Sequence, residues 1–273
     1  MIRISAYIPC YNNEKTIESA ISSIIGQAYP IDDFFIIDDG STDDTLRIVQ
    51  QFKLQTHKNA DNKGRGFVRN LSTTLAKNQF ILCLDASKSL EPNFVKNGIQ
   101  HFQDPTISAV IGRIGQDTTH NYLDRWRKIH LFKTEQVYST PIECGLITYG
   151  ALMRKNAILD AGNYNPSLIH SEDADLGKRL IQNGWKVILD PNLSVNSLTS
   201  DSFWKLLERY WRWYAGQNND VSLQSYFQNL RYSLSYMVKK DIQDRDFHRL
   251  KLSLICPHYQ FIKSIISRKG GST

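Results

Sequence analysis

The sequence predicts an α/β fold in which a mostly parallel sheet is flanked by helices and followed by a helical C-terminal extension. Strand-like and helix-like segments alternate in short units up to Gly112, and the last third of the chain reads as helical. With 41% hydrophobic and 22% charged residues among 273, the composition is that of an ordinary globular protein. We expect one main domain, residues 1–200, and a helical extension, residues 201–273.

The first βα unit sets the pattern. Apolar and polar side chains alternate over residues 2–8, and Pro9 ends this predicted strand. Apolar residues at helical spacing follow within residues 14–27, where we expect Asn13 to cap the helix and Gly26 to end it.

Two further units repeat this rhythm. A strand is predicted at residues 34–38, and the turn after it offers a capping box, Ser41 with Asp44, for a second helix. A third helix precedes the strand at residues 80–85. Residues 113–143 break the rhythm and are rich in aromatic and charged side chains, so we expect an insertion over the sheet.

Acidic residues stand at the ends of predicted strands, Asp38 and Asp39 at the end of one and Asp85 at the end of another. A single Asp in such a place usually caps a turn. Because the carboxyl ends of parallel strands share one edge of a sheet, these acids together predict a polar crevice. Such a crevice could read the base and ribose hydroxyls of a nucleotide.

Several protein classes are disfavoured. The chain has no Gly-rich dinucleotide fingerprint, no phosphate-binding P-loop and no G-x-S-x-G elbow. Its four cysteines are far apart, which argues against a zinc ribbon. The formal net charge of +6 favours anionic partners, such as nucleotides or acidic lipid headgroups, without choosing among them.

The cellular location is predicted from the N-terminal segment and from the hydropathy of the chain. The N-terminus carries no secretion-signal pattern, so we expect a cytoplasmic protein, in part at the inner face of the membrane. No window approaches the roughly 18 to 20 apolar residues of a membrane span, so membrane contact would be peripheral. The apolar and basic tail from Phe247 is compatible with docking on an anionic membrane surface, and equally with a terminal helix packed on the domain.

Five motifs, in order, resemble the inverting family-2 glycosyltransferases of the GT-A fold. They are "IPCYNNEKTI", "IIDDGSTDDT", "NKGRGFVRN", "LDAS" and "HSEDADLGKRL", within about the first 200 residues. The resemblance implies that Pro9, Tyr11 and Asn12 form the loop against the nucleotide base. It also implies that Asp39 recognises the uracil edge or ribose, and that Arg69 is the base-side arginine.

The same resemblance implies the catalytic groups. Asp85 matches the first acid of the D-x-D element, and Asp173, beside Glu172, matches the base that takes the acceptor proton. Carboxylates in the first turn of a helix are also favoured by its dipole alone, which is the structural alternative for Glu172 and Asp173.

A divalent cation, Mg²⁺ or Mn²⁺, is usual in such enzymes, but its ligands are altered here. Ser87 stands where the last D-x-D acid is expected, and Asn196 falls where a histidine is expected, so Asp85 is at most the one metal ligand. Lys88 could place an ammonium near the donor diphosphate instead. The alternative is that Lys88 is a solvated loop residue.

Two aromatic and basic segments are further candidates. Arg209, Arg212 and Trp213 resemble the family's Q-x-x-R-W element, which lines the acceptor channel or contacts the diphosphate. Aromatic side chains of the insertion would suit an acceptor wall, and core packing explains them equally well; they are Tyr122, Trp126 and His130.

The expected activity is transfer of one sugar from a nucleotide-diphosphate sugar, with UDP-sugar the commonest donor type, to a hydroxyl of a glycan or lipid-linked acceptor. Inversion at the sugar carbon and a role in cell-surface polysaccharide assembly are implied by the resemblance, and no nucleic-acid partner is expected. The alternative is a catalytically weakened relative that binds sugar nucleotides or glycans, which Ser87 and Asn196 motivate.

Overall fold

The computed structural model describes residues 2–115, 121–136, 138–214 and 222–270. By its internal contacts the chain forms two compact units. The sheet unit consists of Met1–Gly115 and Val137–Thr199, and the helical unit consists of Gln116–Gln136 and Ser200–Thr273.

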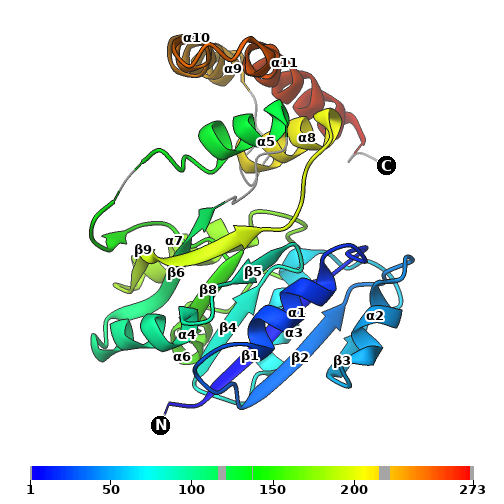
Figure 1. The fold of residues 1–273 in the computed structure, drawn as a ribbon, viewed down its shortest axis with the longest axis vertical. Helices are drawn as coiled ribbons and strands as arrows, with labels where there is room; N and C mark the ends of the chain where they lie inside the picture. Colours follow the sequence, from blue (N-terminus) through cyan, green and yellow to red (C-terminus); the bar gives the residue numbers. More distant parts are fainter. Residues whose placement is uncertain (1, 116–120, 137, 215–221, 271–273) are drawn as a thin grey trace. The chain divides into compact units, whose positions relative to one another are not determined.

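The sheet unit contains a mixed sheet in the order β3-β2-β1-β4-β8-β6-β9-β5, with β7 paired to β9 (Figure 1). The strands are β1 (Ile4–Cys10), β2 (Asp33–Asp38), β3 (Gln55–Lys58), β4 (Phe80–Leu84), β5 (Lys88–Leu90), β6 (Ile107–Gly115), β7 (Ile142–Glu143), β8 (Gly150–Arg154) and β9 (Lys186–Ser197). Within the described residues, β5, β7 and β8 run against the direction of the other strands. The predicted α/β class with a mostly parallel sheet is therefore confirmed.

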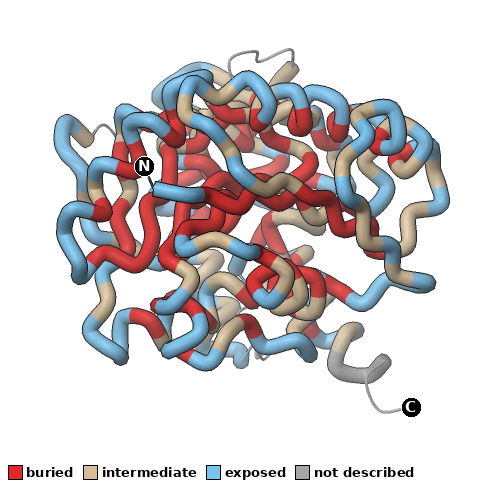
Figure 2. The backbone as a smooth tube through the Cα atoms, turned by 90° about the horizontal axis from the view of Figure 1, so that it is seen from below, coloured by how far each residue is buried: buried red, intermediate tan, exposed pale blue. Residues whose placement is uncertain are grey.

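Helices flank this sheet, and the strands between them form the core (Figures 1 and 2). The helices of this unit are α1 (Ile17–Ile25), α2 (Thr45–Gln51), α3 (Arg65–Leu75), α4 (Phe94–Gly98), the 3₁₀ turn η1 (Ile99–Gln103), α6 (Lys155–Asp160) and α7 (Glu172–Gln182). Both α1 and α3 pack on β1, whose residues are buried except for half-buried Pro9. Strands covered in this way read as apolar runs, as Phe80–Leu84 does.

The predicted N-terminal helix caps are wrong, although the helices themselves are present. The N-cap of α1 is Thr16, and the amide oxygen of Asn13 instead accepts from the backbone N–H of Tyr11. The N-cap of α2 is Asp44, whose side chain makes no capping bond, and the Ser41 hydroxyl accepts from the backbone N–H of Asn12. Asn13 thus bonds within its own loop and Ser41 bonds to the loop after β1, and such bonds compete with capping. Gly26 does follow α1 as predicted.

The inserted segment also differs from expectation, because residues 116–136 belong to the helical unit. That unit contains α5 (Tyr122–Trp126), the π-helical turn η2 (Arg127–Leu131), α8 (Phe203–Tyr214), α9 (Leu223–Tyr232), the π-helical turn η3 (Ser233–Val238), α10 (Lys239–Gln243) and α11 (Phe247–Gly270). Trp126 is buried there and donates from its indole N–H to the Ser253 hydroxyl at 2.8 Å. No described helix has a stretch long and apolar enough to cross a bilayer.

Candidate active site at the strand ends

The carboxyl ends of β1, β2 and β4 meet at one edge of the sheet. The three strands are parallel, with Cys10 beside Asp38 and Tyr7 beside Cys83 in the register. Asp39 and Asp85 follow β2 and β4 directly, so they flank the loop that leaves β1. This is the polar edge that the sequence predicted.

Asp39 organises the loop that leads into α3. One of its carboxylate oxygens accepts from the side-chain amide of Asn59 at 2.7 Å and from the backbone N–H of Lys63 at 3.0 Å, and the other accepts from the N–H of Gly64. Asp39 is buried, so its first role in the fold is to hold this loop against the strand end.

The loop after β1 is fixed by Asn12 and presents Tyr11. Asn12 adopts a left-handed backbone conformation, with φ of 52°, and its side-chain oxygen accepts from the N–H of Thr42 at 2.8 Å. Tyr11 is 45% exposed, so its ring is accessible at the rim. A flat, accessible aromatic ring beside a strand end suits stacking on a nucleotide base.

Arg69 is the centre of a buried ion-pair cluster. Its Nε donates to Glu172 at 2.8 Å and its Nη2 donates to Asp85 at 2.7 Å, while Nη1 donates to the Cys83 sulfur. The Arg69 side chain is only 2% exposed. The expected base-side arginine therefore lies beneath the rim, where it connects the acid after β4 to the acid that begins α7.

The two neighbouring carboxylates at the rim have opposite pKa shifts. Burial acts to raise the pKa of Asp85, but the positive charges of Arg69, Arg65 and Lys88 outweigh it and lower that pKa. Burial and the nearby charge of Glu172 raise the pKa of Asp173, against the opposing effect of Arg69. Asp85 is thus held ionised, and Asp173 binds a proton more readily than an ordinary aspartate.

Glu172 and Asp173 are adjacent in sequence but differ in their surroundings. Glu172 is buried in its pair with Arg69. Asp173 is half-buried, and its carboxylate accepts from the N–H of Ala174 at 2.8 Å and lies 3.4 Å from the N–H of Thr148. Of the two, Asp173 is the carboxylate that remains accessible at the rim.

Backbone close to β8 connects these acids. The N–H of Asp85 donates to the carbonyl of Tyr149, and the Cys83 thiol donates to the carbonyl of Thr148. Sequence reasoning missed Thr148 and Cys83, since neither belongs to a motif and both act through tertiary contact.

Gly66 lets α3 lie close to the loop that leads into α7. A Cβ at Gly66 would lie 2.2 Å from the carbonyl oxygen of Asn165 and 2.6 Å from that of Leu168. The N–H of Gly66 donates to the same Leu168 carbonyl at 2.9 Å. Only a residue without a side chain permits this approach.

The turn after Asp85 carries Ser87 and Lys88. The Lys88 ammonium lies 3.1 Å from the Ser197 hydroxyl and 3.5 Å from the Ser87 hydroxyl. Lys88 is only 3% exposed, so the reading of it as a solvated loop residue is wrong. In the β5–β9 ladder Lys88 pairs with Ser197, and Asn196 pairs with Ser89.

These residues do not fit a divalent cation held by the chain's own carboxylates. Mg²⁺ and Mn²⁺ prefer carboxylate and other oxygen ligands in near-octahedral geometry. The one strand-end acid of the turn, Asp85, is bonded to Arg69, and an ammonium adjoins Ser87. No group of three or more His, Cys, Asp or Glu side chains suited to a metal ion occurs among the described residues.

The candidates in the helical unit are engaged in its own packing. Arg209 donates from Nε and Nη2 to both oxygens of Asp201, at 2.8 and 3.1 Å. Trp213 is 43% exposed, with its ring 5.9 Å from that of Phe132, and Arg212 is half-buried on the same helix.

The three aromatic candidates of the insertion differ in burial. Trp126 and His130 are buried, and the His130 ring lies 2.8 Å from the buried Asp241 carboxylate. These two residues therefore pack in the core of the helical unit. Tyr122 is half-buried against His248.

Comparison with known proteins gives consistent results. The model of the family described as Glycosyl transferase family 2 matches residues 5–161. The poly-beta-1,6-N-acetyl-D-glucosamine synthase of Staphylococcus aureus (strain COL) is 24% identical over 246 residues, which are 84% of this chain and 57% of that protein. The chain thus spans little more than half the length of the curated relatives it matches.

Solved structures show the same fold. The mannosyltransferase PcManGT from Pyrobaculum calidifontis, in complex with GDP-Man and Mn²⁺, is similar with a TM-score of 0.68 at 14% identity, covering 99% of this chain and 88% of that one. Residues 1–349 of S. aureus TarS, in complex with UDP-GlcNAc, are similar with a TM-score of 0.58 at 16% identity, covering 96% and 81%. At these identities the likeness concerns the fold, which is of the GT-A type.

Proposed function

The chain belongs to glycosyltransferase family 2, and from this premise we propose that it transfers a sugar from a nucleotide-diphosphate sugar to an acceptor hydroxyl. We further propose that transfer proceeds with inversion, that the acceptor is a glycan or lipid-linked glycan, and that the product belongs to a cell-surface polysaccharide. The observation that carries the proposal is the accessible Asp173 carboxylate beside the buried Asp85–Arg69–Glu172 cluster.

Asp173 is the proposed general base. In an inverting displacement the acceptor oxygen attacks the anomeric carbon, its proton passes to a carboxylate, and the nucleoside diphosphate leaves from the opposite face with the bonding electron pair. A base must hold that proton during the reaction, so a raised pKa makes Asp173 better suited to it than an ordinary aspartate.

Arg69 and Glu172 are proposed as positioning residues. The buried guanidinium fixes the Asp85 carboxylate after β4, and it also fixes Glu172, the residue before Asp173 in α7. A rigid frame of this kind keeps two reacting groups in place, which supports rate through orientation. Neither Arg69 nor Glu172 needs to touch the substrate for this role.

For the donor, a uridine or guanosine nucleotide is the first choice to test. The named structures of similar fold were determined with UDP-GlcNAc and with GDP-Man. In this chain the exposed Tyr11 ring and the fixed Asn12 loop would receive the base, and the Asp39 loop would lie against the ribose. Which sugar the site takes is decided by a panel of donors.

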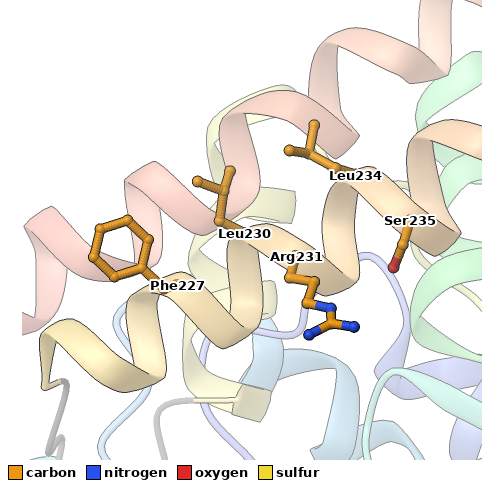
Figure 3. Close-up of a pocket in the computed structure, with 5 residues that line it drawn as sticks. All are labelled: Phe227, Leu230, Arg231, Leu234 and Ser235. Atoms are coloured by element: carbon orange, nitrogen blue, oxygen red, sulfur yellow. The ribbon is translucent and has the colours of Figure 1, made fainter.

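The helical unit is proposed to contact an anionic membrane surface peripherally, at the inner face of the cell membrane. Phe227, Leu230, Leu234, Arg231 and Ser235 line an apolar depression on α9 and η3, as Figure 3 shows. Phe227 is 62% and Leu234 49% exposed. Apolar side chains beside a basic one suit the boundary of acidic headgroups, where lipid-linked acceptors reside.

A vesicle assay tests this contact. Co-sedimentation with vesicles containing phosphatidylglycerol should exceed that with neutral phosphatidylcholine vesicles, and Phe227→Ser with Leu234→Ser should reduce it. Equal sedimentation of the wild-type and doubly substituted proteins would contradict the contact.

The first test of the proposed function is a donor panel. Purified protein is incubated with UDP-, GDP- and dTDP-sugars and with extracts of glycan and lipid-linked acceptors, and the released nucleoside diphosphate and labelled product are measured. Release that depends on an acceptor is the expected result, and the configuration and length of the product report inversion and the number of sugars added. Binding of nucleotide sugars without any turnover would favour the binding-module alternative.

A further inference from the structure

Lys88 is a buried cation at the turn that follows the first strand-end acid. We propose that the diphosphate of the donor is neutralised by the Lys88 ammonium, oriented by Ser87 and Ser197, and that no divalent cation held by this chain is needed. The inference rests on the proposed function, because it requires a nucleoside diphosphate as the bound ligand.

The turn fixes where the ammonium lies. The N–H of Lys88 donates to the carbonyl of Asp85 at 2.9 Å, which closes the turn between β4 and β5. The carbonyl of Ser87 accepts from the N–H of Leu198, so the turn is also bonded to the end of β9. Lys88 thereby stands three residues after Asp85 at the same edge of the sheet as the donor site.

The register explains which side chain of β9 meets the lysine. In an antiparallel ladder, directly paired residues place their side chains on the same face of the sheet, and the next pair uses the other face. Lys88 pairs with Ser197, and its Nζ lies 3.1 Å from the Ser197 hydroxyl. Asn196, one residue earlier, pairs with Ser89 on the opposite face, with its side-chain oxygen close to Gly115.

The charges favour an anion at this place over a second cation. The hydroxyls of Ser87 and Ser197, which lie 3.5 and 3.1 Å from the ammonium, are neutral groups. The Asp85 carboxylate is already bonded to Arg69 at 2.7 Å. A divalent ion at the Ser87 position would meet the ammonium, which lies 3.5 Å from that hydroxyl, and like charges at such a distance repel.

Once a divalent ion is disfavoured, the lysine and the two hydroxyls of this turn are suited to binding phosphate oxygens. An ammonium is a compact point charge that pairs well with phosphate oxygens, and hydroxyls can donate to the same oxygens. During transfer, negative charge grows on the leaving diphosphate, and a preplaced cation stabilises that charge. Lys88 would therefore contribute to both donor affinity and rate.

The first experiment measures nucleotide affinity of the wild-type protein by calorimetry, with UDP, GDP, UMP and GMP, in EDTA and in Mn²⁺. We expect the favoured diphosphate to bind in EDTA within about threefold of its affinity in Mn²⁺, and more tightly than its monophosphate. Binding that requires Mn²⁺ would overturn the inference while leaving the proposed function standing. Absence of binding under both conditions would contradict both.

Variants then identify the group responsible. Lys88→Met should weaken diphosphate binding about 10- to 100-fold, the usual effect of losing a hydrogen bond to a charged group, and leave monophosphate binding unchanged. Lys77→Met is the matched control, because Lys77 pairs with Asp33 at the opposite end of the strands. Equal loss for UDP and UMP, or for GDP and GMP, would assign Lys88 a merely structural role.

A gain-of-function variant completes the test without depending on the stability of Lys88→Met. Ser87→Asp with Lys88→Ser supplies the missing acid and removes the ammonium, so diphosphate binding should become dependent on Mn²⁺. Electron paramagnetic resonance should show Mn²⁺ bound to this variant in the presence of nucleotide. Under the same conditions it should show no Mn²⁺ bound to the wild-type protein. A wild-type signal of equal strength would contradict the inference.

Discussion

The two units each contain a buried ion-pair cluster, and the clusters differ in how their acids are paired. In the sheet unit one cation, Arg69, pairs with two acids, Asp85 and Glu172. In the helical unit Arg127 also pairs with two acids, Asp124 and Asp201, but Asp201 pairs in addition with a second cation, Arg209. A further carboxylate with a raised pKa, Asp173, lies beside the first cluster.

This difference distinguishes the candidate site from a structural contact. Asp201 receives a forked pair of hydrogen bonds from Arg209 and one more from Arg127, and it connects η2 to α8 within the helical unit. Arg69 instead fixes two acids so that a third is held at the rim with an altered proton affinity. Charged residue types alone therefore do not identify a candidate site, and the accessible carboxylate with a shifted pKa is the feature that favours the first cluster.

Replacing the rim carboxylate should give the largest effect. Asp173→Asn keeps the shape of the side chain but cannot take the acceptor proton, so the turnover rate should fall about 10²- to 10⁴-fold. Rates of product formation measure this, with nucleotide affinity as the check that the fold is intact. Asp175→Asn is the control, because Asp175 lies in the same turn and pairs with Arg179; comparable losses in both variants would refute the assignment.

Removing the central cation should have the next largest effect, on stability. Arg69→Met leaves the buried Glu172 and the partly buried Asp85 without their shared partner, which costs about 3–5 kcal/mol of unfolding free energy. Arg209→Met leaves Asp201 paired with Arg127, and its side chain is 20% exposed, so we expect about 1 kcal/mol or less. Denaturant titration measures both. Equal losses would mean that the two clusters do not differ as described.

A smaller effect is expected from the glycine that lets α3 approach the loop before α7. Gly66→Ala forces a methyl group against two carbonyl oxygens and should cost about 1–3 kcal/mol of unfolding free energy. Gly145→Ala is the matched control, since nothing lies within 4 Å of a Cβ there. A Gly66→Ala protein as stable as the control would show that the Arg69–Glu172 pair does not depend on this close approach.

The sequence predicted the sheet well because its strands carry local signals. Apolar runs followed by Asp39 and Asp85 identify two strand ends, and parallel pairing places them at one edge. The strand end predicted at Pro9 was wrong, because β1 continues through Pro9, which pairs with Ile37, to Cys10. The ladder of β5 on β9 was not predictable, since three residues carry no recognisable period. The N-terminal caps were misjudged because the Asn13 side chain bonds within its own loop and Ser41 bonds to the loop after β1, instead of to helix ends.

The candidate site was predictable as a set of residue types and not as a set of contacts. The motifs point to Asp85, Glu172 and Asp173, but that Glu172 pairs with a buried Arg69, 103 residues away, is a tertiary fact. The burial of Lys88 against Ser197 likewise depends on the register of a long-range ladder. The assignment of residues 116–136 to the helical unit depends on the packing of Trp126 and His130, which their sequence alone leaves open.

The most direct test of the central claim is the pH profile of kcat/KM for sugar transfer by the wild-type protein. A base with a raised pKa loses its charge earlier as the pH falls, so activity should decline on the acid side at a pH above the ordinary pKa of an aspartate, about 3.9. The residual activity of Asp173→Asn should show no such decline. The same acid limb in both proteins would contradict the assignment of Asp173 as the general base.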